Sequence, residues 1–334
     1  MAENVEVTPL RLVFLGSDPI ALPLLDWLAG EGSAFAQVVG IFTQPDRPAG
    51  RGQKIEANAI KRWALARGLA VLQPEKLGET DRAGLAALQA DVALVMAYGH
   101  LLRDDFIATP RLGTLNLHAS LLPKHRGASP IQTAIASGEH ETGVTLMRIV
   151  RKLDAGPVAD AERVDIGPRD TAAEVEAKLA AACVPLLART LPRLAQGELA
   201  FAEQDHAAAT YCRRLKKDDG ALDFAAPATV LAARINGLFP WPGCTVEISG
   251  EAVKPGLADF EAAAVASAPG TVLGTDSESL RVATSDGVLR LLRLQRPGGK
   301  MLPAPEFLRG FPVAPGTSLP SRPMPLLAGP APFR

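Results

Sequence analysis

Cysteine is scarce in this 334-residue chain, which holds only Cys183, Cys212 and Cys244. The three lie far apart in the sequence and lack the paired spacing of metal ligands, so the pattern disfavours a disulfide scaffold or a cysteine-bound zinc site. Scattered cysteines of this kind are typical of buried apolar side chains in a reducing compartment. We therefore expect a cytoplasmic protein.

Long apolar runs and a strong net charge are also missing. No segment approaches the length needed to cross a bilayer. The first ten residues, MAENVEVTPL, lack the basic stretch and the apolar run of a secretory signal. Hydrophobic residues make up 47% of the chain and charged residues 21%, and the formal net charge is -1. This composition predicts a globular protein with a sizeable core and no membrane contact.

A glycine-rich dinucleotide-binding turn is absent as well. The first apolar run, Leu12–Leu15, is followed by Gly16-Ser17-Asp18-Pro19, which holds a single glycine where the dinucleotide-binding pattern needs several. One glycine does not let the backbone approach a pyrophosphate in that manner. The turn therefore disfavours a nicotinamide-dependent dehydrogenase.

The N-terminal part of the chain alternates apolar, strand-like runs with helical patterns. Such alternation is typical of βαβ units, so we predict an α/β fold with a Rossmann-like, doubly wound and mostly parallel sheet. A long helix rich in Ala and Leu is expected from Thr171 to Gln196, kinked or split at Pro185 and Pro192. The predicted strands are Leu12–Leu15, Val38–Thr43, Ala70–Leu72, Val92–Ala97, Thr114–His118, Thr142–Ile149 and Val158–Asp165.

From Tyr211 onward, short β runs alternate with Gly and Pro, a texture that predicts a small, OB-like β-barrel. The length of the chain fits two domains. The predicted strands here are Cys244–Ile248, Gly270–Leu273, Ser279–Ala283 and Leu289–Leu294. The expected segments are a catalytic domain over 1–200, a basic linker over 201–217, the barrel over 218–311 and a Pro-rich tail over 312–334, irregular or disordered.

Asn116 and His118 end the strand-like run Thr114–His118. Alternate residues of a strand share a face, so both side chains would project at the carboxyl edge of the sheet, where open α/β sheets bind ligands. An amide can donate to a developing oxyanion while an imidazole exchanges a proton, which suits acyl-type transfer. Asp154, in the turn Leu153–Pro157, could orient that imidazole. Alternatively, Asn116 and His118 satisfy loop groups and Asp154 forms an ordinary Asx turn.

Two basic segments are further candidates for binding. The loop Thr43–Lys54 carries three cations together with prolines and glycines, and it could insert against a nucleic acid or an anionic substrate. The segment Arg213–Lys217 carries four cations beside a C-terminal part that holds 14 Lys and Arg against 11 Asp and Glu from residue 207 onward. A basic linker of this kind could follow a phosphate backbone. Solvated surface charge is the alternative for both segments.

Taken together, these segments resemble the methionyl-tRNA formyltransferases, within the wider family that takes a formyl group from 10-formyltetrahydrofolate. The segments similar to the wider family are Asn116–Pro123, Ala97-Tyr98-Gly99 and Leu153–Gly156. The segments similar to the methionyl-tRNA enzymes are Thr43–Gly52, like their tRNA-contacting loop, and Phe239–Gly243 with the β runs after it, like their C-terminal barrel. The resemblance covers residues 10–295.

The resemblance implies transfer of a formyl group from 10-formyltetrahydrofolate to the α-amine of methionine on initiator methionyl-tRNA. The products are N-formylmethionyl-tRNA, for translation initiation, and tetrahydrofolate. Asn116 and protonated His118 would stabilise the oxyanion, and Asp154 would hold His118 and help remove the amine's proton through water. No metal is implied, because the folate carries the activated carbon.

The resemblance also implies binding residues. The implied folate-binding residues are Val95, Met96, Ala97, Tyr98, Gly99, Ser120, Leu121, Leu122 and Pro123. The implied tRNA-binding residues are Arg47, Arg51, Lys54, Arg213, Arg214, Lys216 and Lys217. We expect a monomer that contacts no membrane.

Two other functions stay open from the sequence. The same chemistry could formylate a nucleotide sugar or glycinamide ribonucleotide, although those relatives do not combine the basic loop with a small C-terminal β domain. The chain could also be an RNA-binding protein on a catalytically inactive scaffold. Intact Asn116, His118 and Asp154 argue against that second alternative.

Overall fold

The computed structural model describes residues 8–49 and 54–333, which form two compact units. Unit 1 consists of the chain up to Pro123, Gly143–Val164 and Ala177–Ala208. Unit 2 consists of Lys124–Thr142, Asp165–Glu176 and the chain from Ala209 onward. The predicted segments 1–200, 201–217, 218–311 and 312–334 stay a prediction, because two units that interleave along the chain neither match nor exclude them.

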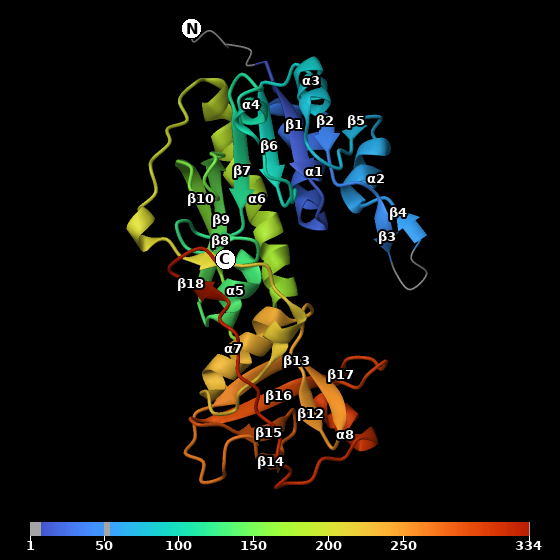
Figure 1. The fold of residues 1–334 in the computed structure, drawn as a ribbon, viewed down its shortest axis with the longest axis vertical. Coiled ribbons are helices and arrows are strands. Elements are labelled where there is room, and N and C mark those ends of the chain that lie inside the picture. Colours follow the sequence, from blue (N-terminus) through green and yellow to red (C-terminus); the bar gives the residue numbers. More distant parts are fainter. Residues whose placement is uncertain (1–7, 50–53, 334) are drawn as a thin grey trace. The chain divides into compact units, whose positions relative to one another are not determined.

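Unit 1 is built on a seven-stranded sheet of order β10-β9-β7-β6-β1-β2-β5 (Figure 1). Every pair from β7 to β5 is parallel, and β7 and β9 are antiparallel. The predicted Rossmann-like, mostly parallel sheet is therefore confirmed. The strands are β1 (Leu10–Gly16), β2 (Ala36–Phe42), β5 (Ala70–Leu72), β6 (Val92–Met96), β7 (Thr114–His118), β9 (Glu141–Arg148) and β10 (Val158–Asp165).

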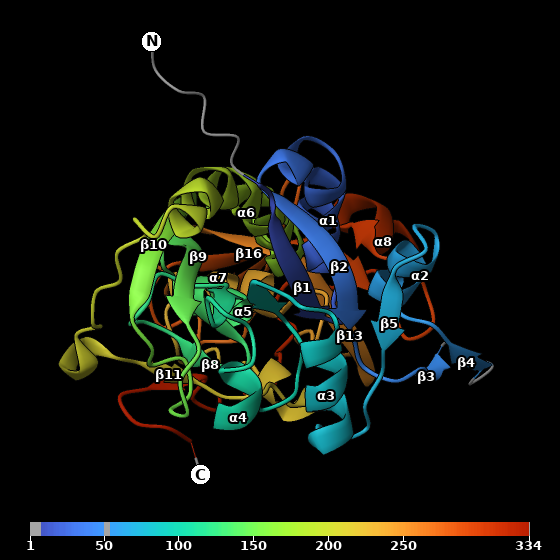
Figure 2. The ribbon, with the colours of Figure 1, turned by 90° about the horizontal axis from the view of Figure 1, so that it is seen from above.

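Continuous apolar runs form the centre of this sheet because helices cover both of its faces. The residues Leu12–Leu15 of β1 are fully buried. Figure 2 shows α1 and α6 over one face and α3 and α4 over the other. The helix α6 runs unbroken through Pro185 and Pro192, so a split of this helix is wrong. The helices are α1 (Leu22–Ala29), α2 (Ala59–Leu65), α3 (Glu79–Ala87), α4 (Asp104–Ile107) and α6 (Ala172–Ala195).

The order of the strands reverses beside β1, and this reversal positions the candidate site. From β1 the chain moves outward to β2 and β5, then returns to β6 and β7 on the other side. Ligands of open α/β sheets bind at such a switch point, outside the carboxyl ends of the strands. Gly16 and Met96 are partners at this edge, and a Cβ on Gly16 would approach the Met96 carbonyl oxygen to 2.6 Å. Glycine therefore lets the two strand ends lie this close.

Unit 2 holds an antiparallel sheet of order β12-β13-β16-β15-β14, with β17 paired to β16. The sheet is curled into a half-barrel, in agreement with the predicted small barrel. Helix α7 packs on β13 and β16, and α5 packs on α7. The elements are α5 (Pro130–Ala136), α7 (Ala228–Leu238), β12 (Val246–Ile248), β13 (Glu251–Glu261), β14 (Val272–Thr275), β15 (Leu280–Ala283), β16 (Val288–Gln295), β17 (Leu302–Pro303) and α8 (Ala304–Gly310).

The Pro-rich tail is packed in unit 2, so the expectation of disorder is wrong for its described part. It carries few regular elements, but its backbone amides donate to the rest of the unit, from Gly316 to Val272, from Leu319 to Gly270 and from Arg322 to Leu222, each at 2.8 Å. Near its end, β18 (Ala328–Gly329) joins β11 (Tyr211–Cys212), which also pairs with β8 (Arg126–Gly127).

The packing of the tail predicts unequal costs for two leucine substitutions. Leu319 is 2% exposed and Leu326 is 77% exposed. We expect Leu319→Ala to lower the free energy of unfolding by about 2–5 kcal/mol, because it leaves a cavity in the core. Leu326→Ala should change it by less than about 0.5 kcal/mol. Urea unfolding of both variants measures the difference, and equal midpoints would mean that the tail does not pack as described.

Candidate functional site

Asn116 and His118 lie at the carboxyl end of β7, as predicted. Asn116 is the partner of Val95 in β6, and His118 is the partner of Thr145 in β9. The pairing continues without a register shift through both residues, so the pleat directs their side chains to one face of the sheet. His118 is buried and Asn116 is partly buried.

The structure brings Asp154 to His118. The distance from His118 Nδ1 to Asp154 Oδ2 is 3.7 Å, and the two side chains are only 7% and 14% exposed. This distance is longer than a hydrogen bond but within the range of an ion pair. A carboxylate in this place can orient the imidazole ring. The predicted His–carboxylate pair is therefore present in the geometry of unit 1.

A tight turn holds Asp154 in position. The backbone of Asp154 has φ 47°, in the left-handed region, and a Cβ on Gly156 would overlap the carbonyl oxygen of Arg148. The Arg148 amide donates to Pro157 O at 2.9 Å, which closes the turn against the end of β9. The side chain of Gln204 donates to Asp154 O at 3.0 Å and to Gly156 O at 2.7 Å. Gln204 was not predicted, because it lies 50 residues from Asp154 in the sequence.

The hydroxyl of Thr145 holds the backbone of the loop after His118. Thr145 donates to Ser120 O at 2.6 Å and accepts from the Leu122 amide at 3.1 Å. On the same strand a Cβ at Gly143 would press into Leu121, so glycine makes room for that side chain. Ser120 is buried, whereas Leu121, Leu122 and Pro123 are partly exposed. The loop thus presents apolar surface beside His118.

The segment after β6 contributes mainly its backbone. Val95 and Met96 are buried in the strand, while Ala97 and Gly99 are exposed. The Ala97 carbonyl accepts from the Ser17 amide at 3.2 Å, and the Tyr98 carbonyl accepts from Gln44 Nε2 at 3.0 Å. These two bonds tie the segment to the turns that follow β1 and β2.

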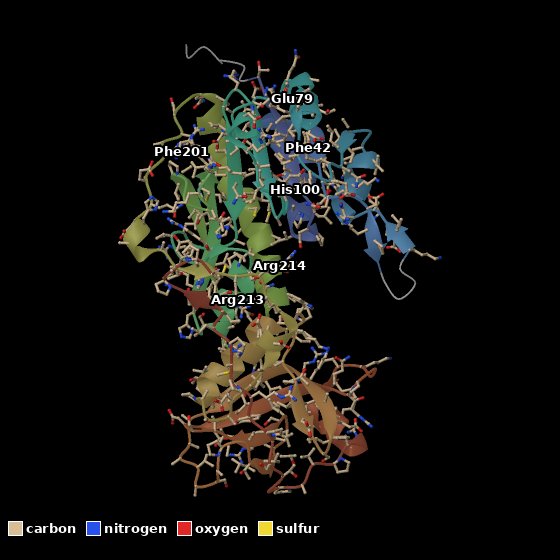
Figure 3. All side chains as sticks on the ribbon, viewed as in Figure 1. Phe42, Glu79, His100, Phe201, Arg213 and Arg214 are labelled. Carbon is tan, nitrogen blue, oxygen red and sulfur yellow. The ribbon has the colours of Figure 1, made fainter. Side chains whose placement is uncertain are left out.

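The side chain of Tyr98 turns into the core of unit 1 rather than outward. Burial, with a further contribution from the Asp81 carboxylate, raises the pKa of the Tyr98 hydroxyl far above its ordinary range. Its ring meets that of His100 at 5.1 Å between centroids. Figure 3 shows His100 just beyond the end of β6. Neither Tyr98 Oη nor His100 Nε2 has a hydrogen-bond partner among the described residues.

The basic loop forms a short hairpin of β3 (Arg47–Ala49) and β4 (Lys54–Glu56). Lys54 is exposed, and Arg47 forms an exposed ion pair with Glu75 at 3.1 Å. Arg51, also predicted to bind, lies outside the described residues. Solvent screens such a surface pair, so Glu75 leaves Arg47 available to a stronger partner.

The base of the hairpin is firmly held. Asp46 accepts from Gln73 Nε2 at 2.8 Å and pairs with Lys61 Nζ at 2.6 Å. The Gln73 hydrogen bond and then the Lys61 ammonium lower the pKa of Asp46, which keeps this carboxylate charged. Gln73 Nε2 also donates to Gln44 O at 2.9 Å. The exposed cations of the hairpin therefore project from a fixed stem.

The four cations of the linker have different environments. Arg213 donates to Asp219 through Nη1 at 2.8 Å and lies over the Phe333 ring at 5.7 Å. Burial by itself raises the pKa of Asp219, but the Arg213 hydrogen bond, the Lys216 backbone amide and the charges of Arg213 and Arg234 together lower this pKa below its ordinary value. Arg214, Lys216 and Lys217 are exposed and have no acidic partner in the described parts of the chain. Figure 3 labels Arg213 and Arg214 on this segment.

Neither a metal centre nor a membrane span is found within residues 8–49 and 54–333. Over these ranges, no group of three or more His, Cys, Asp or Glu side chains is arranged to hold a metal ion. Over the same ranges, no helix has the length and apolar character needed to cross a membrane.

Family models and curated relatives both assign the chain to the same family. The chain matches the formyl transferase family over residues 10–191 and the formyl transferase C-terminal domain over residues 214–312. It is 42% identical over 317 residues to a methionyl-tRNA formyltransferase of Burkholderia thailandensis, covering 92% of this chain and 96% of the relative. It is 41% identical over 309 residues to the enzyme of the same name from Aromatoleum aromaticum, with the same coverage.

Solved structures support the fold at lower identity. The sugar 3N-formyl transferase WlaRD matches with a TM-score of 0.64 at 16% identity, over 87% of this chain and 99% of that one. HypX from Aquifex aeolicus in complex with tetrahydrofolic acid matches with a TM-score of 0.60 at 15% identity, over 90% of this chain and 47% of that one.

The turn at Asp154 predicts a specific sensitivity to a single methyl group. We expect Gly156→Ala to lower the free energy of unfolding by about 2 kcal/mol or more, because the added Cβ would force the turn away from Arg148 O. Gly310→Ala is the matched control, since nothing lies within 4 Å of a Cβ there. Urea unfolding measures both, and a wild-type midpoint for Gly156→Ala would contradict the described turn.

Proposed function

The chain belongs to the formyltransferase family, among the methionyl-tRNA formyltransferases, and we propose here how its residues carry out that family's reaction. The protein transfers a formyl group from a formyltetrahydrofolate donor to the free α-amine of methionine on initiator methionyl-tRNA. The 42% identity to named methionyl-tRNA formyltransferases along almost their whole length carries this conclusion. We propose 10-formyltetrahydrofolate as the donor.

We propose Asn116, His118 and Asp154 as the catalytic residues. The amine nitrogen bonds to the formyl carbon, and the carbonyl oxygen gains negative charge as its π bond opens. The Asn116 amide donates to that oxygen, and protonated His118 offsets its charge. The new C–N bond stays, the bond from carbon to the donor nitrogen breaks, and the proton lost by the amine ends on the departing nitrogen.

Asp154 acts on this reaction in two ways. At 3.7 Å from Nδ1 it holds the His118 ring and stabilises the charged imidazolium. Through a water molecule it also helps to remove the proton of the attacking amine, which then passes to the departing nitrogen. The burial of both side chains supports this assignment, because charges act more strongly on one another away from bulk water.

We propose that Ser120–Pro123 and Val95–Gly99 line the donor site. Val95–Gly99 includes the end of β6, and Ser120–Pro123 follows β7. The two strands are parallel neighbours that end at the same edge of the sheet, with Val95 paired to Asn116. The partly exposed Leu121, Leu122 and Pro123 offer an apolar wall for a heteroaromatic ring. Since the folate carries the activated carbon, the reaction needs no metal ion.

We propose that the tRNA is bound by Arg47, Arg51 and Lys54 of the hairpin and by Arg214, Lys216 and Lys217 of the linker. These cations would contact phosphates, which is a sequence-independent interaction. The intramolecular pair with Asp219 makes Arg213 a weaker candidate than its neighbours. Because formylated initiator tRNA serves translation, we further propose that the protein acts in the cytoplasm, as a monomer.

A sugar formyltransferase is the nearest alternative in chemistry. The sugar enzyme WlaRD shares the fold at 16% identity, which supports the fold but not the substrate. An RNA-binding protein on an inactive scaffold is disfavoured by the distance between His118 and Asp154, since an inactive site has no need to keep that pair.

The catalytic assignment predicts large losses of rate without loss of fold. Asn116→Ala, His118→Ala and Asp154→Asn should each lower kcat by about a hundredfold or more, the usual scale for losing an oxyanion donor or a general acid–base group. Circular dichroism should remain that of the wild type. Single-turnover formylation of methionyl-tRNA measures the effect. A folded variant with wild-type turnover would remove its residue from the catalytic set.

The hairpin predicts a change in salt dependence. Replacing Arg47, Arg51 and Lys54 with Ala should weaken tRNA use and leave the KM of the donor nearly unchanged, because these cations bind phosphates only. The slope of log affinity against log salt should become shallower by up to about one unit for each phosphate that is no longer bound. Arg111→Ala is the control, since Arg111 is an exposed cation paired with Asp91, the residue before β6, at the opposite edge of the sheet. Identical slopes in the triple variant and the wild type would mean that the hairpin cations do not bind the tRNA.

A further inference from the structure

Trp241 contributes little to the core of unit 2, because most of its side chain faces solvent. Its side chain is 57% exposed, while the neighbouring Pro242 and Gly243 are buried. The loop that carries it is short and closed, because the Gly243 amide donates to Leu238 O, at the end of α7, over 2.8 Å. Because the loop is closed by this hydrogen bond and the residues after Trp241 are buried, the loop holds the indole at the surface.

The segment that directly follows the basic linker lies against this loop. A Cβ on Gly220 would overlap the carbonyl oxygen of Gly243, and the Thr245 amide donates to Gly220 O at 3.1 Å. Three residues before Gly220 in the chain comes Lys217, and exposed Lys216 and Arg214 precede it. Asp218 is the exposed acid nearest to them in the sequence. The linker therefore places a net positive charge beside the loop of Trp241.

A second group of cations lies beyond the other end of the loop. A Cβ on Gly256, in β13, would overlap the Met301 side chain and approach the Phe239 ring to 3.1 Å. Phe239 therefore packs where β13 meets the segment that ends at Met301. Exposed Lys254, Arg293 and Lys300 lie along these same segments.

These three cations are not neutralised locally. None of them has an ion-pair partner within residues 8–49 and 54–333. The nearby Arg296 differs, because it is matched by Glu251 at 2.7 Å. The loop of Trp241 is thus flanked by two groups of unmatched cations, Arg214, Lys216 and Lys217 on one side and Lys254, Arg293 and Lys300 on the other.

We propose that Trp241 stacks on an unpaired nucleobase of the tRNA, with the flanking cations on the adjacent phosphates. This inference rests on the proposed function, which makes tRNA the substrate. An isolated indole between cations matches a nucleic acid strand, which offers an aromatic face and negative charge in alternation. A protein partner would need a wider apolar patch for binding, and a polyanion without bases has no ring on which the indole could stack.

Tryptophan fluorescence tests this stacking directly, since the chain has only three tryptophans and Trp63 is buried. Uncharged tRNA should quench the emission of the wild type, and inorganic polyphosphate at equal charge should not. Trp241→Phe should lose this quenching but bind tRNA within about threefold of the wild type in a filter assay. Trp241→Ala should bind about tenfold or more weakly, the scale of removing one base–aromatic stack.

Trp63→Phe is the control for quenching and should respond to tRNA as the wild type does. Quenching of equal size in Trp241→Phe, or wild-type tRNA affinity in Trp241→Ala, would overturn the inference. If the wild type formylates methionyl-tRNA while Trp241→Ala keeps the same KM for it, the stacking fails and the proposed function stands. If tRNA quenches Trp241 but the wild type formylates nothing, the stacking stands and the proposed function fails.

Discussion

The close approach of the Gly156 turn to the end of β9 is the contact on which the site depends. Only a residue without a Cβ fits against the Arg148 carbonyl oxygen, and this fit brings Asp154 back over the sheet. The Gln204 amide then holds the turn from its other side with two hydrogen bonds. As a result the carboxylate of Asp154, whose backbone is in the left-handed region, lies 3.7 Å from the buried imidazole of His118. That turn therefore places the Asp154 carboxylate where it can orient the His118 ring.

The strand β9 organises more than this turn. Thr145, opposite His118, fixes the loop Ser120–Pro123 through its hydroxyl, and Gly143 makes room for Leu121. Thus β9 supports the turn of Asp154 at its C-terminal end, and it supports the proposed donor wall through Thr145 and Gly143. The parallel half of the sheet supplies Asn116 and the ends of β1 and β6 at the same edge, as its winding requires. The proposed chemistry therefore lies where parallel and antiparallel pairing meet.

The sequence predicted best what depends on local pattern. Buried runs such as Leu12–Leu15 and the alternation of strands with helices indicated the parallel sheet, and the pleat placed Asn116 and His118 together. The 11-residue β13 was missed because Lys254, Pro255 and Gly256 interrupt its apolar pattern, and its register shifts at that point. Gln204 and Thr145 could not be predicted, because their roles come from contacts between segments distant in sequence. The packing of the tail was missed since it depends on backbone hydrogen bonds to segments distant in sequence and on buried side chains such as Leu319.

The choice of formyl acceptor tests the proposed function most directly. The purified protein would be incubated with 10-formyltetrahydrofolate and an equimolar mixture of initiator methionyl-tRNA and an amino-sugar nucleotide, and both possible products would be quantified by mass spectrometry. The proposed function predicts N-formylmethionyl-tRNA as the dominant product, with tetrahydrofolate released in equal amount. Formylation of the sugar in preference to the tRNA, or consumption of the donor without formylmethionine, would contradict it.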